Sequence, residues 1–166
     1  MTLRTGFFQE LESAFSAHLL GPDYAVCSFE LDNLDKLASL FINYIPETWE
    51  LPIWLLLLGD MGSGKTTFVR SIAMQLGVST VCSPSFTLLQ IHQTSRGTLY
   101  HFDLFHINRH PERKSSISEF LDSPGLKCIE WPTHELIKMN ASPVIILKLS
   151  LLSETSRQLH VEARSA

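Results

Sequence analysis

Residues 59–66 read Gly-Asp-Met-Gly-Ser-Gly-Lys-Thr, and an apolar run from Ile53 to Leu58 stands directly before them. The pattern G-x-x-x-x-G-K-[ST] between a strand and a helix is typical of a phosphate-binding loop. Glycines let consecutive backbone N–H groups curl around a diphosphate, the lysine brings positive charge to the β and γ oxygens, and the threonine hydroxyl binds Mg²⁺. The sequence therefore predicts a nucleotide site rather than a plain glycine-rich turn.

The segment after the loop has the spacing of a helix. Phe68, Ile72 and Leu76 are apolar at intervals of four residues, and Gly77 follows as a stop signal. Such a helix points its N-terminal, positive end at a bound anion. The predicted nucleotide-binding residues are Asp60, Met61, Gly62, Ser63, Gly64, Lys65, Thr66 and Thr67.

Composition limits the class of protein. The chain has 166 residues, 45% of them hydrophobic, which is enough for one domain to bury a core. A net charge of -4 gives no overall positive field, so we do not expect a free-standing nucleic-acid-binding protein. Three scattered cysteines indicate reduced thiols. Gln9, Glu10 and Glu12 interrupt the N-terminal apolar stretch, which fits neither a secretory signal nor a membrane span, so we expect a cytoplasmic protein.

Helices and strands alternate early in the sequence, and hairpins enter later. Helical patterns cover residues 5–20, 33–45, 116–121 and 132–139. Strand-like runs, besides the one before the loop, cover residues 83–91, 98–104, 127–131, 143–149 and 157–163. We expect a three-layer α/β, P-loop NTPase-like domain with a mixed, partly antiparallel sheet. Residues 1–24 are predicted to be an N-terminal extension with a peripheral helix, and residues 25–166 a single P-loop ATPase domain.

Two acidic residues follow strand-like runs and compete for the metal-binding and water-orienting roles that hydrolysis requires. Glu130 ends a short apolar strand, where a carboxylate faces the metal across from Thr66. Asp103 follows an alternating run that begins at Tyr100 and also reaches a strand end. Either acid alone is typical of a solvated strand end. Together with the phosphate loop, they become candidate catalytic residues.

The segment Ser-Pro-Ser-Phe-Thr at residues 83–87 has two interpretations. It forms an ordinary turn that leads into a strand, or the hydroxyls of Ser85 and Thr87 contact the γ-phosphate or the metal and move after hydrolysis, as switch loops do. The histidines lack the spacing of a zinc motif, and His101, His106 and His110 are interpreted as lone surface or packing residues.

Four motifs in order resemble the TsaE family, also called YjeE. They are GDMGSGKTTFVR at 59–70, SPSFT at 83–87, YHFDL at 100–104 and IEWP at 129–132. Many ATPases share the phosphate loop, whereas the ordered set of four is much more specific. The similarity covers most of the chain, from about Phe29 to Leu149.

The resemblance implies a cytoplasmic ATPase that uses ATP and Mg²⁺ and assists the TsaB–TsaD complex in placing a threonylcarbamoyl group on an adenosine of tRNA. The protein would meet tRNA indirectly, through that complex, and would not transfer the group itself. By the same resemblance Lys65, Asp103 and Glu130 are catalytic, Thr66 and Glu130 hold Mg²⁺, and Trp131 packs near the nucleotide or a partner.

The chain departs from the family pattern after Asp103. Family members usually continue with Tyr and Arg, whereas this chain has Phe105 and His106, and His106 lacks the permanent charge of an arginine. The usual threonine of the SPSFT segment is Ser85, which keeps the hydroxyl.

Two other functions stay open. A P-loop kinase of a small acceptor would use Arg109, Arg113 and Lys114 as a cationic lid, although such a run is usually a solvated loop. A nucleotide-gated interaction protein would need no significant turnover. A GTPase is less favoured, because the sequence has no N-K-x-D segment to read guanine.

Overall fold

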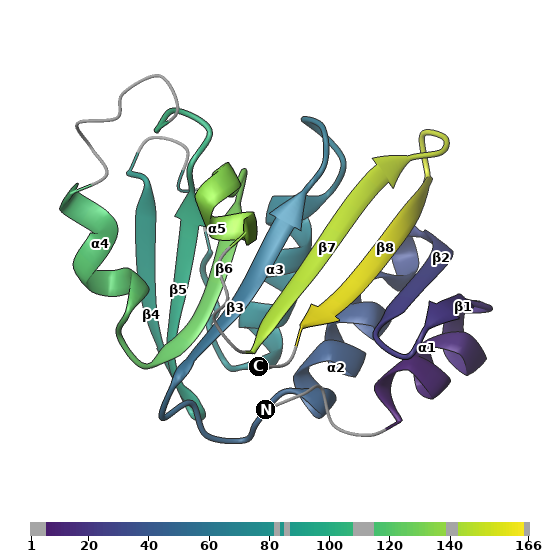
Figure 1. Ribbon diagram of the computed structural model, residues 1–166, viewed down its shortest axis with the longest axis horizontal. Helices are drawn as coiled ribbons and strands as arrows, with labels where there is room; N and C mark the ends of the chain where they lie inside the picture. The colour runs from purple at the N-terminus through teal and green to yellow at the C-terminus, as the bar shows by residue number, and fades with distance from the viewer. Residues whose placement is uncertain (1–5, 82–83, 85–86, 108–114, 139–142, 165–166) are drawn as a thin grey trace.

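Figure 1 shows the computed structural model, which describes residues 6–81, 84, 87–107, 115–138 and 143–164. The described strands form one sheet in the order β1-β2-β8-β7-β3-β6-β5-β4. Strand β3 is parallel to both of its neighbours, β6 and β7, and β5 is parallel to β6. The pairs β1–β2, β2–β8, β7–β8 and β4–β5 are antiparallel. The predicted mixed sheet is confirmed.

The strands have the following bounds: β1 His18–Gly21, β2 Tyr24–Glu30, β3 Pro52–Leu58, β4 Leu89–Thr94, β5 Gly97–Asp103, β6 Gly125–Glu130, β7 Val144–Leu151 and β8 Ser156–Arg164. The helices are α1 Phe7–Phe15, α2 Leu34–Tyr44, α3 Lys65–Gln75, α4 Ser115–Leu121 and α5 His134–Lys138, and a short 3-10 helix, η1, covers Leu31–Asn33.

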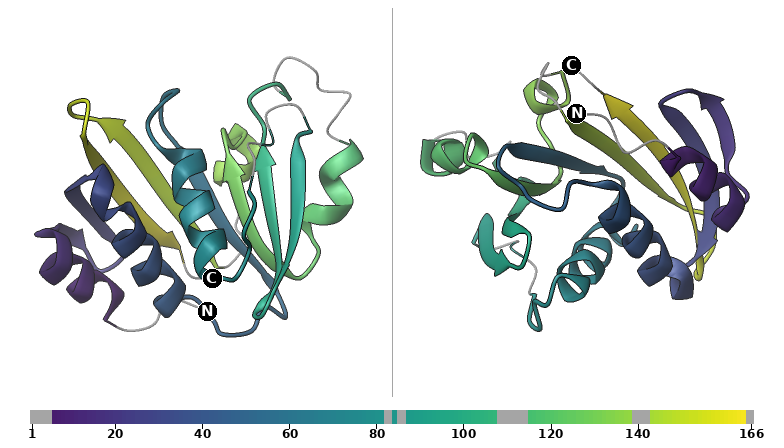
Figure 2. Two further views of the ribbon diagram at one scale, coloured as in Figure 1. Left: turned by 180° about the vertical axis from the view of Figure 1, so that it is seen from behind. Right: turned by 90° about the horizontal axis from the view of Figure 1, so that it is seen from below.

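Helices cover both faces of the sheet, which gives the three predicted layers. The view from below in Figure 2 shows α2 and α3 on one side of the sheet and α4 and α5 on the other. Buried residues of α1, α2 and α3 form one apolar cluster with one face of the sheet, and residues of α4 and α5 join a second cluster on the other face. Central strands need apolar residues on both faces in such an arrangement.

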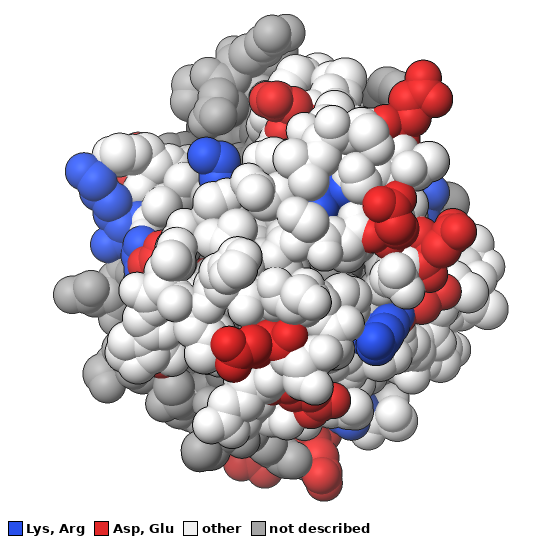
Figure 3. All heavy atoms as spheres, turned by 90° about the vertical axis from the view of Figure 1, so that its right-hand side faces the viewer, with Lys and Arg blue, Asp and Glu red and all other residues white. Residues whose placement is uncertain are grey.

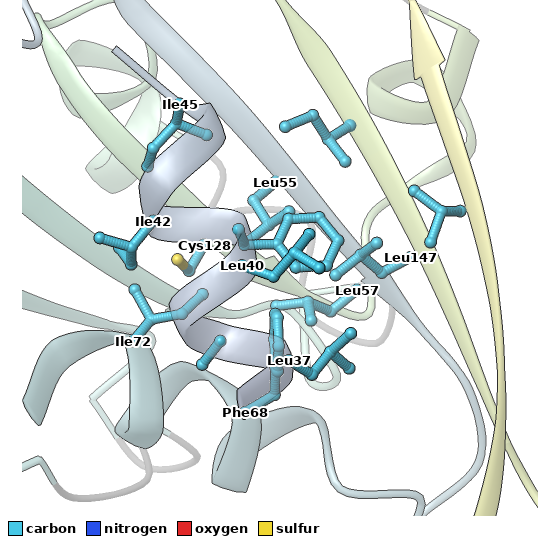
Figure 4. Close-up of a cluster of buried hydrophobic side chains, with 14 of the residues drawn as sticks. Leu37, Leu40, Ile42, Ile45, Leu55, Leu57, Phe68, Ile72, Cys128 and Leu147 are labelled. Carbon is cyan, nitrogen blue, oxygen red and sulfur yellow. The ribbon is translucent and has the colours of Figure 1, made fainter. Parts of the chain in front are cut away.

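Strand β3 meets this need by alternation. Ile53, Leu55 and Leu57 belong to the first cluster, and Trp54 and Leu56 belong to the second. Figure 4 shows the first cluster, in which side chains of α2 and α3 lie against β3 and its neighbours. This packing fixes the position at which the chain leaves β3 and enters the glycine-rich loop.

The helices predicted around residues 33–45 and after the loop are confirmed as α2 and α3, with bounds that differ by one or two residues. The first helix is shorter than predicted, because α1 ends at Phe15 and Ser16 has a φ of 50°. Residues His18–Gly21 instead form the edge strand β1. The sequence analysis also missed β2, although Ala25, Cys27 and Phe29 alternate in burial as a half-buried strand requires.

The strand-like runs predicted at residues 83–91 and 98–104 pair as one of the expected hairpins, β4 and β5, but the first strand begins at Leu89 and not at residue 83. The backbone N–H groups of Thr87 and Leu88 both donate to the carbonyl of Pro84, so this part of the segment is a turn. Ser83, Ser85 and Phe86 lie outside the described residues. In the described part of the chain, no helix is long and apolar enough to cross a membrane.

A lysine is buried on the sheet face that α4 and α5 cover, next to Tyr100 of the second apolar cluster. Lys127 of β6 has no exposed surface, its Nζ donates to the carbonyl of Ser123, and the same atom lies 3.7 Å from the ring centre of Tyr100. Burial lowers the pKa of Lys127 from 10.5 to about 8, and the charge of Asp122 opposes this shift. The folded protein therefore releases this proton at lower pH than the unfolded chain does.

Lys127→Met tests this assignment. Between pH 8 and 10.5 the unfolded chain binds more protons than the folded protein, so the free energy of unfolding of the wild type rises with pH. Each unit of difference between the folded and unfolded pKa corresponds to about 1.4 kcal/mol. From pH 7.5 to pH 10, we therefore expect the free energy of unfolding of the wild type to rise by about 2 kcal/mol more than that of the variant. Urea unfolding of both proteins at the two pH values measures it, and a difference that is independent of pH contradicts the assignment.

Candidate nucleotide-binding site

The glycine-rich loop lies between the end of β3 and the start of α3. Gly59 has a φ of 136°, and a Cβ atom built on it would lie 2.2 Å from the backbone oxygen of Leu149 on β7. Gly64, with a φ of 105°, precedes the first residue of α3. Only glycine adopts these backbone conformations without strain. The loop is therefore drawn tightly against β7, and the N-terminus of α3 opens onto its concave side.

Lys65 is the first residue of α3, and its side chain turns back over the loop. Its Nζ donates to the carbonyl oxygens of Gly59 and Asp60 at 2.7 and 2.8 Å, and lies 3.9 Å from the ring centre of Trp131. Burial lowers the pKa of Lys65, and the negative charges of nearby carboxylates, that of Glu130 first, oppose this shift. The ammonium group is thus held inside the loop with its donors directed at backbone oxygens.

Glu130 connects the loop with the adjacent strands. Its Oε2 accepts a hydrogen bond from the hydroxyl of Thr66 at 2.9 Å, and its Oε1 lies 2.7 Å from Nε2 of His101. Only 2% of Glu130 is exposed. The sheet register pairs Glu130 with Asp103, so the two predicted acids stand side by side at the ends of β6 and β5.

Asp103 is held by backbone contacts at the same edge of the sheet. Its Oδ1 accepts a hydrogen bond from the backbone N–H of Phe105 at 3.0 Å, and its own N–H donates to the carbonyl of Leu88. The N–H of Leu104 donates to the carbonyl of Glu130. These bonds fix the direction in which the chain leaves β5, and they place the Asp103 carboxylate at the mouth of the loop.

Trp131 has an unusual backbone conformation for a bulky residue. Its φ is 56°, its N–H donates to the carbonyl of Leu57 on β3, and its ring centre lies 5.0 Å from that of Phe105. A positive φ strains the backbone of a residue with a large side chain, and such residues cluster at functional sites. Here the conformation turns the indole ring over Lys65.

These groups surround one pocket with a volume of about 320 Å³. Its lining residues are Met61, Gly62, Gly64, Lys65, Thr66, Thr67, Asp103, Phe105, His106, Glu130 and Trp131. The pocket therefore joins most of the predicted nucleotide residues to both predicted acids and to Trp131. Among the predicted loop residues, the side chain of Asp60 is exposed and Ser63 is buried, and neither lines the pocket.

The switch-like segment is not part of this arrangement as far as the structure describes it. Thr87 is exposed in the turn before β4 and does not line the pocket. Ser85 lies outside the described residues, as do His110 and the predicted cationic lid of Arg109, Arg113 and Lys114.

Of the two interpretations of His101, the structure excludes a lone surface residue. The residue is fully buried and its ring is hydrogen-bonded to Glu130, while His106 lines the pocket. A signal was present in the sequence, because His101 stands two residues before Asp103 and thus on the same face of the strand.

The oxygen atoms of the pocket fit a magnesium ion. The described residues contain no group of three or more histidine, cysteine or acidic side chains that could hold a metal alone. Thr66 and Glu130 instead present one hydroxyl and one carboxylate at hydrogen-bond distance. Mg²⁺ is commonly bound by one or two such protein oxygens together with phosphate oxygens and water.

A glycine-rich loop between the central strand and the following helix, with acids at the ends of neighbouring strands, defines a P-loop NTPase-like protein. The fold agrees with the crystal structure of Bacillus subtilis YdiB, with a TM-score of 0.63, 21% sequence identity and coverage of 89% of each chain. The model of the family described as threonylcarbamoyl adenosine biosynthesis protein TsaE matches residues 30–159. The chain belongs to the TsaE family.

Three relatives named tRNA threonylcarbamoyladenosine biosynthesis protein TsaE illustrate the similarity. The Aquifex aeolicus protein is 36% identical over 109 residues, which are 63% of this chain and 73% of that protein. The Rickettsia typhi protein is 37% identical over 128 residues, which are 75% of this chain and 88% of that protein. The Borreliella burgdorferi protein is 35% identical over 95 residues, which are 51% of this chain and 64% of that protein.

Gly59→Ala tests the tight approach of the loop to β7. Because the new Cβ would lie 2.2 Å from a backbone oxygen, we expect the free energy of unfolding to fall by about 3 kcal/mol through overpacking and strain at positive φ. Gly21→Ala is the matched control, since an added Cβ there meets no atom within 4 Å, and should change stability by less than about 0.5 kcal/mol. Equal urea midpoints for the two variants would show that the approach is not tight.

Proposed function

We propose that this protein binds and hydrolyses ATP and acts with the TsaB–TsaD complex in the threonylcarbamoyladenosine modification of tRNA. The observation that carries the proposal is the convergence of Lys65, Thr66, Asp103 and Glu130 on one pocket. Membership of the TsaE family supports the pathway. The partnership with TsaB–TsaD rests on the family resemblance, and the ATPase chemistry rests on the side chains of the pocket.

In the binding step, the loop amides and the N-terminus of α3 receive the phosphates of ATP. The Nζ of Lys65 exchanges its bonds to the carbonyls of Gly59 and Asp60 for bonds to phosphate oxygens. Thr66 and Glu130 would hold Mg²⁺, which would supply positive charge to neutralise the phosphates. The Thr66 hydroxyl and Oε2 of Glu130 lie 2.9 Å apart, which is close enough for one ion to bind both oxygens.

In the hydrolysis step, a water molecule attacks the γ-phosphorus in line with the leaving oxygen. Asp103 lines the pocket beside Glu130, and its carboxylate is oriented by the backbone N–H of Phe105. A carboxylate in this position accepts a hydrogen bond from the attacking water and orients it. Lys65 stabilises the charge that develops on the transferred phosphoryl group.

The charge of the molecule supports contact with tRNA through partners rather than directly. The formal net charge is -4. On the side of the molecule that carries β1 and β2, basic side chains lie mainly toward one edge, and the middle of the face shows acidic and uncharged ones (Figure 3). Direct binding to a phosphate backbone relies on clustered lysine and arginine over the contact surface, which the described residues in the middle of this face do not provide.

Lys65→Ala tests the binding step. Loss of the charged donor should weaken the binding of a non-hydrolysable ATP analogue with Mg²⁺ by roughly 100-fold, as expected for a charged hydrogen-bonding group. Lys36→Ala is the control, because Lys36 is an exposed lysine of α2 that donates to Ala14 and does not line the pocket. Calorimetry measures both affinities, and wild-type affinity in folded Lys65→Ala contradicts the assignment.

Addition of the TsaB–TsaD complex tests the pathway and the reaction together. We expect the complex to bind this protein in the presence of an ATP analogue and to raise its rate of ATP hydrolysis. Pull-down with and without nucleotide, alongside phosphate-release assays, measures both. If the complex captures this protein only with nucleotide and no ATP is hydrolysed, the protein is a nucleotide-gated interaction protein instead. If phosphate is transferred to a small acceptor, it is a kinase. Absence of nucleotide binding in every combination rejects the proposal.

A further inference from the structure

His101 lies beneath the pocket and does not line it. It belongs to β5, on the same sheet face as Leu99 and Asp103, and has no exposed surface. Its Nε2 lies 2.7 Å from Oε1 of Glu130, whose Oε2 accepts the hydrogen bond of Thr66. Two hydrogen bonds therefore connect His101, in the buried interior of the sheet, through Glu130 to Thr66 at the loop.

The chemistry of Glu130 decides the direction of the buried bond. A carboxylate only accepts hydrogen bonds, so in the tautomer that matches it Nε2 of His101 is the donor. A buried imidazole without a partner costs free energy that an apolar side chain would avoid. The position lies next to apolar neighbours, since Leu99 and Cys128 are both buried there. Packing alone therefore does not explain a histidine at this place.

We propose that His101 is a positioning residue for the metal site, an inference that rests on the proposed ATPase function. Its hydrogen bond to Oε1 fixes the rotation of the Glu130 carboxylate and directs Oε2 to the point that Thr66 faces. Without this bond, the carboxylate turns about its terminal torsion and meets the metal in several orientations. Such outer partners orient metal ligands and change metal affinity without touching the ion.

The position of the donor atom within the side chain gives a test that separates this role from packing. In histidine, Nε2 is four bonds from Cα, and the amide nitrogen of glutamine is also four bonds away. The amide nitrogen of asparagine is three bonds from Cα, like Nδ1 of histidine, and falls short of Glu130. His101→Gln therefore keeps the donor in place, and His101→Asn removes it while remaining polar.

The experiment titrates Mg²⁺ against each variant at a saturating concentration of a non-hydrolysable ATP analogue and follows binding by calorimetry. We expect His101→Asn to raise the half-saturating Mg²⁺ concentration by about tenfold or more, the usual effect of losing an outer partner. His101→Gln should stay within about threefold of the wild type. ADP affinity in EDTA should be the same in all three proteins, because the bond acts on the metal ligand and not on the loop.

Two controls keep the result interpretable. His160→Asn changes a half-buried histidine of strand β8 that bonds Tyr24 and Gln158 and does not line the pocket, and should leave the Mg²⁺ requirement unchanged. In a Glu130→Gln background, His101→Asn should add no further loss, since the bond that it removes acts only through Glu130. Thermal unfolding of each variant verifies that the protein is folded. If His101→Asn is less stable than the wild type, the comparison of Glu130→Gln with the double variant still shows whether the loss of Mg²⁺ affinity acts through Glu130.

The outcomes distinguish this inference from the function on which it rests. If the wild type takes up no purine triphosphate with or without Mg²⁺, the proposed function fails and this inference fails with it. If the wild type requires Mg²⁺ but His101→Asn and His101→Gln behave alike, or if both weaken ADP binding in EDTA equally, the function stands and His101 is a packing residue.

Discussion

The structure depends on the burial of β3 on both of its faces. Residues Ile53–Leu57 are all buried, with alternate side chains in two separate apolar clusters. A shift of one residue would exchange the two sets, so the register against β6 and β7 is strongly specified. Because β3 and β6 are parallel, their carboxyl ends share an edge of the sheet. This constraint brings two residues that are distant in sequence together, so that the hydroxyl oxygen of Thr66 lies 2.9 Å from Oε2 of Glu130.

The same constraint explains why the pocket contains buried charges. Lys65, Asp103 and Glu130 are 4, 6 and 2% exposed, respectively. Such groups are costly to bury unless polar partners satisfy them. Backbone carbonyls hold the lysine, a backbone N–H holds Asp103, and side chains of α3 and β5 hold Glu130. The fold thus fixes the two carboxylates in place before a ligand binds, whereas Lys65 changes its hydrogen-bond partners in the proposed binding step.

The sequence predicted the elements whose patterns are local. The loop motif and the spacing of Phe68 and Ile72 predicted β3 and α3, and both acids were singled out because they end strand-like runs. Strand β2 was missed because its alternation is short, and it is stabilised by β8, which is distant in sequence. The bond of His101 to Glu130 was not predicted because the two residues are on different strands, and pairing between strands is set by the tertiary fold. The positive φ of Trp131 likewise has no local sequence signal.

The balance of charge in the pocket bears on the form in which a nucleotide enters it. Two acidic side chains, one lysine and one histidine line the site, so the acidic side chains outnumber the lysine. A bare triphosphate would meet repulsion from Asp103 and Glu130 at close range, where a low dielectric strengthens it. A divalent cation held by Thr66 and Glu130 would supply positive charge that offsets this repulsion. In the proposed function, the acids therefore make the loop a receptor for the metal–nucleotide complex, and the hydrogen bonds to Glu130 determine how well the complex is held.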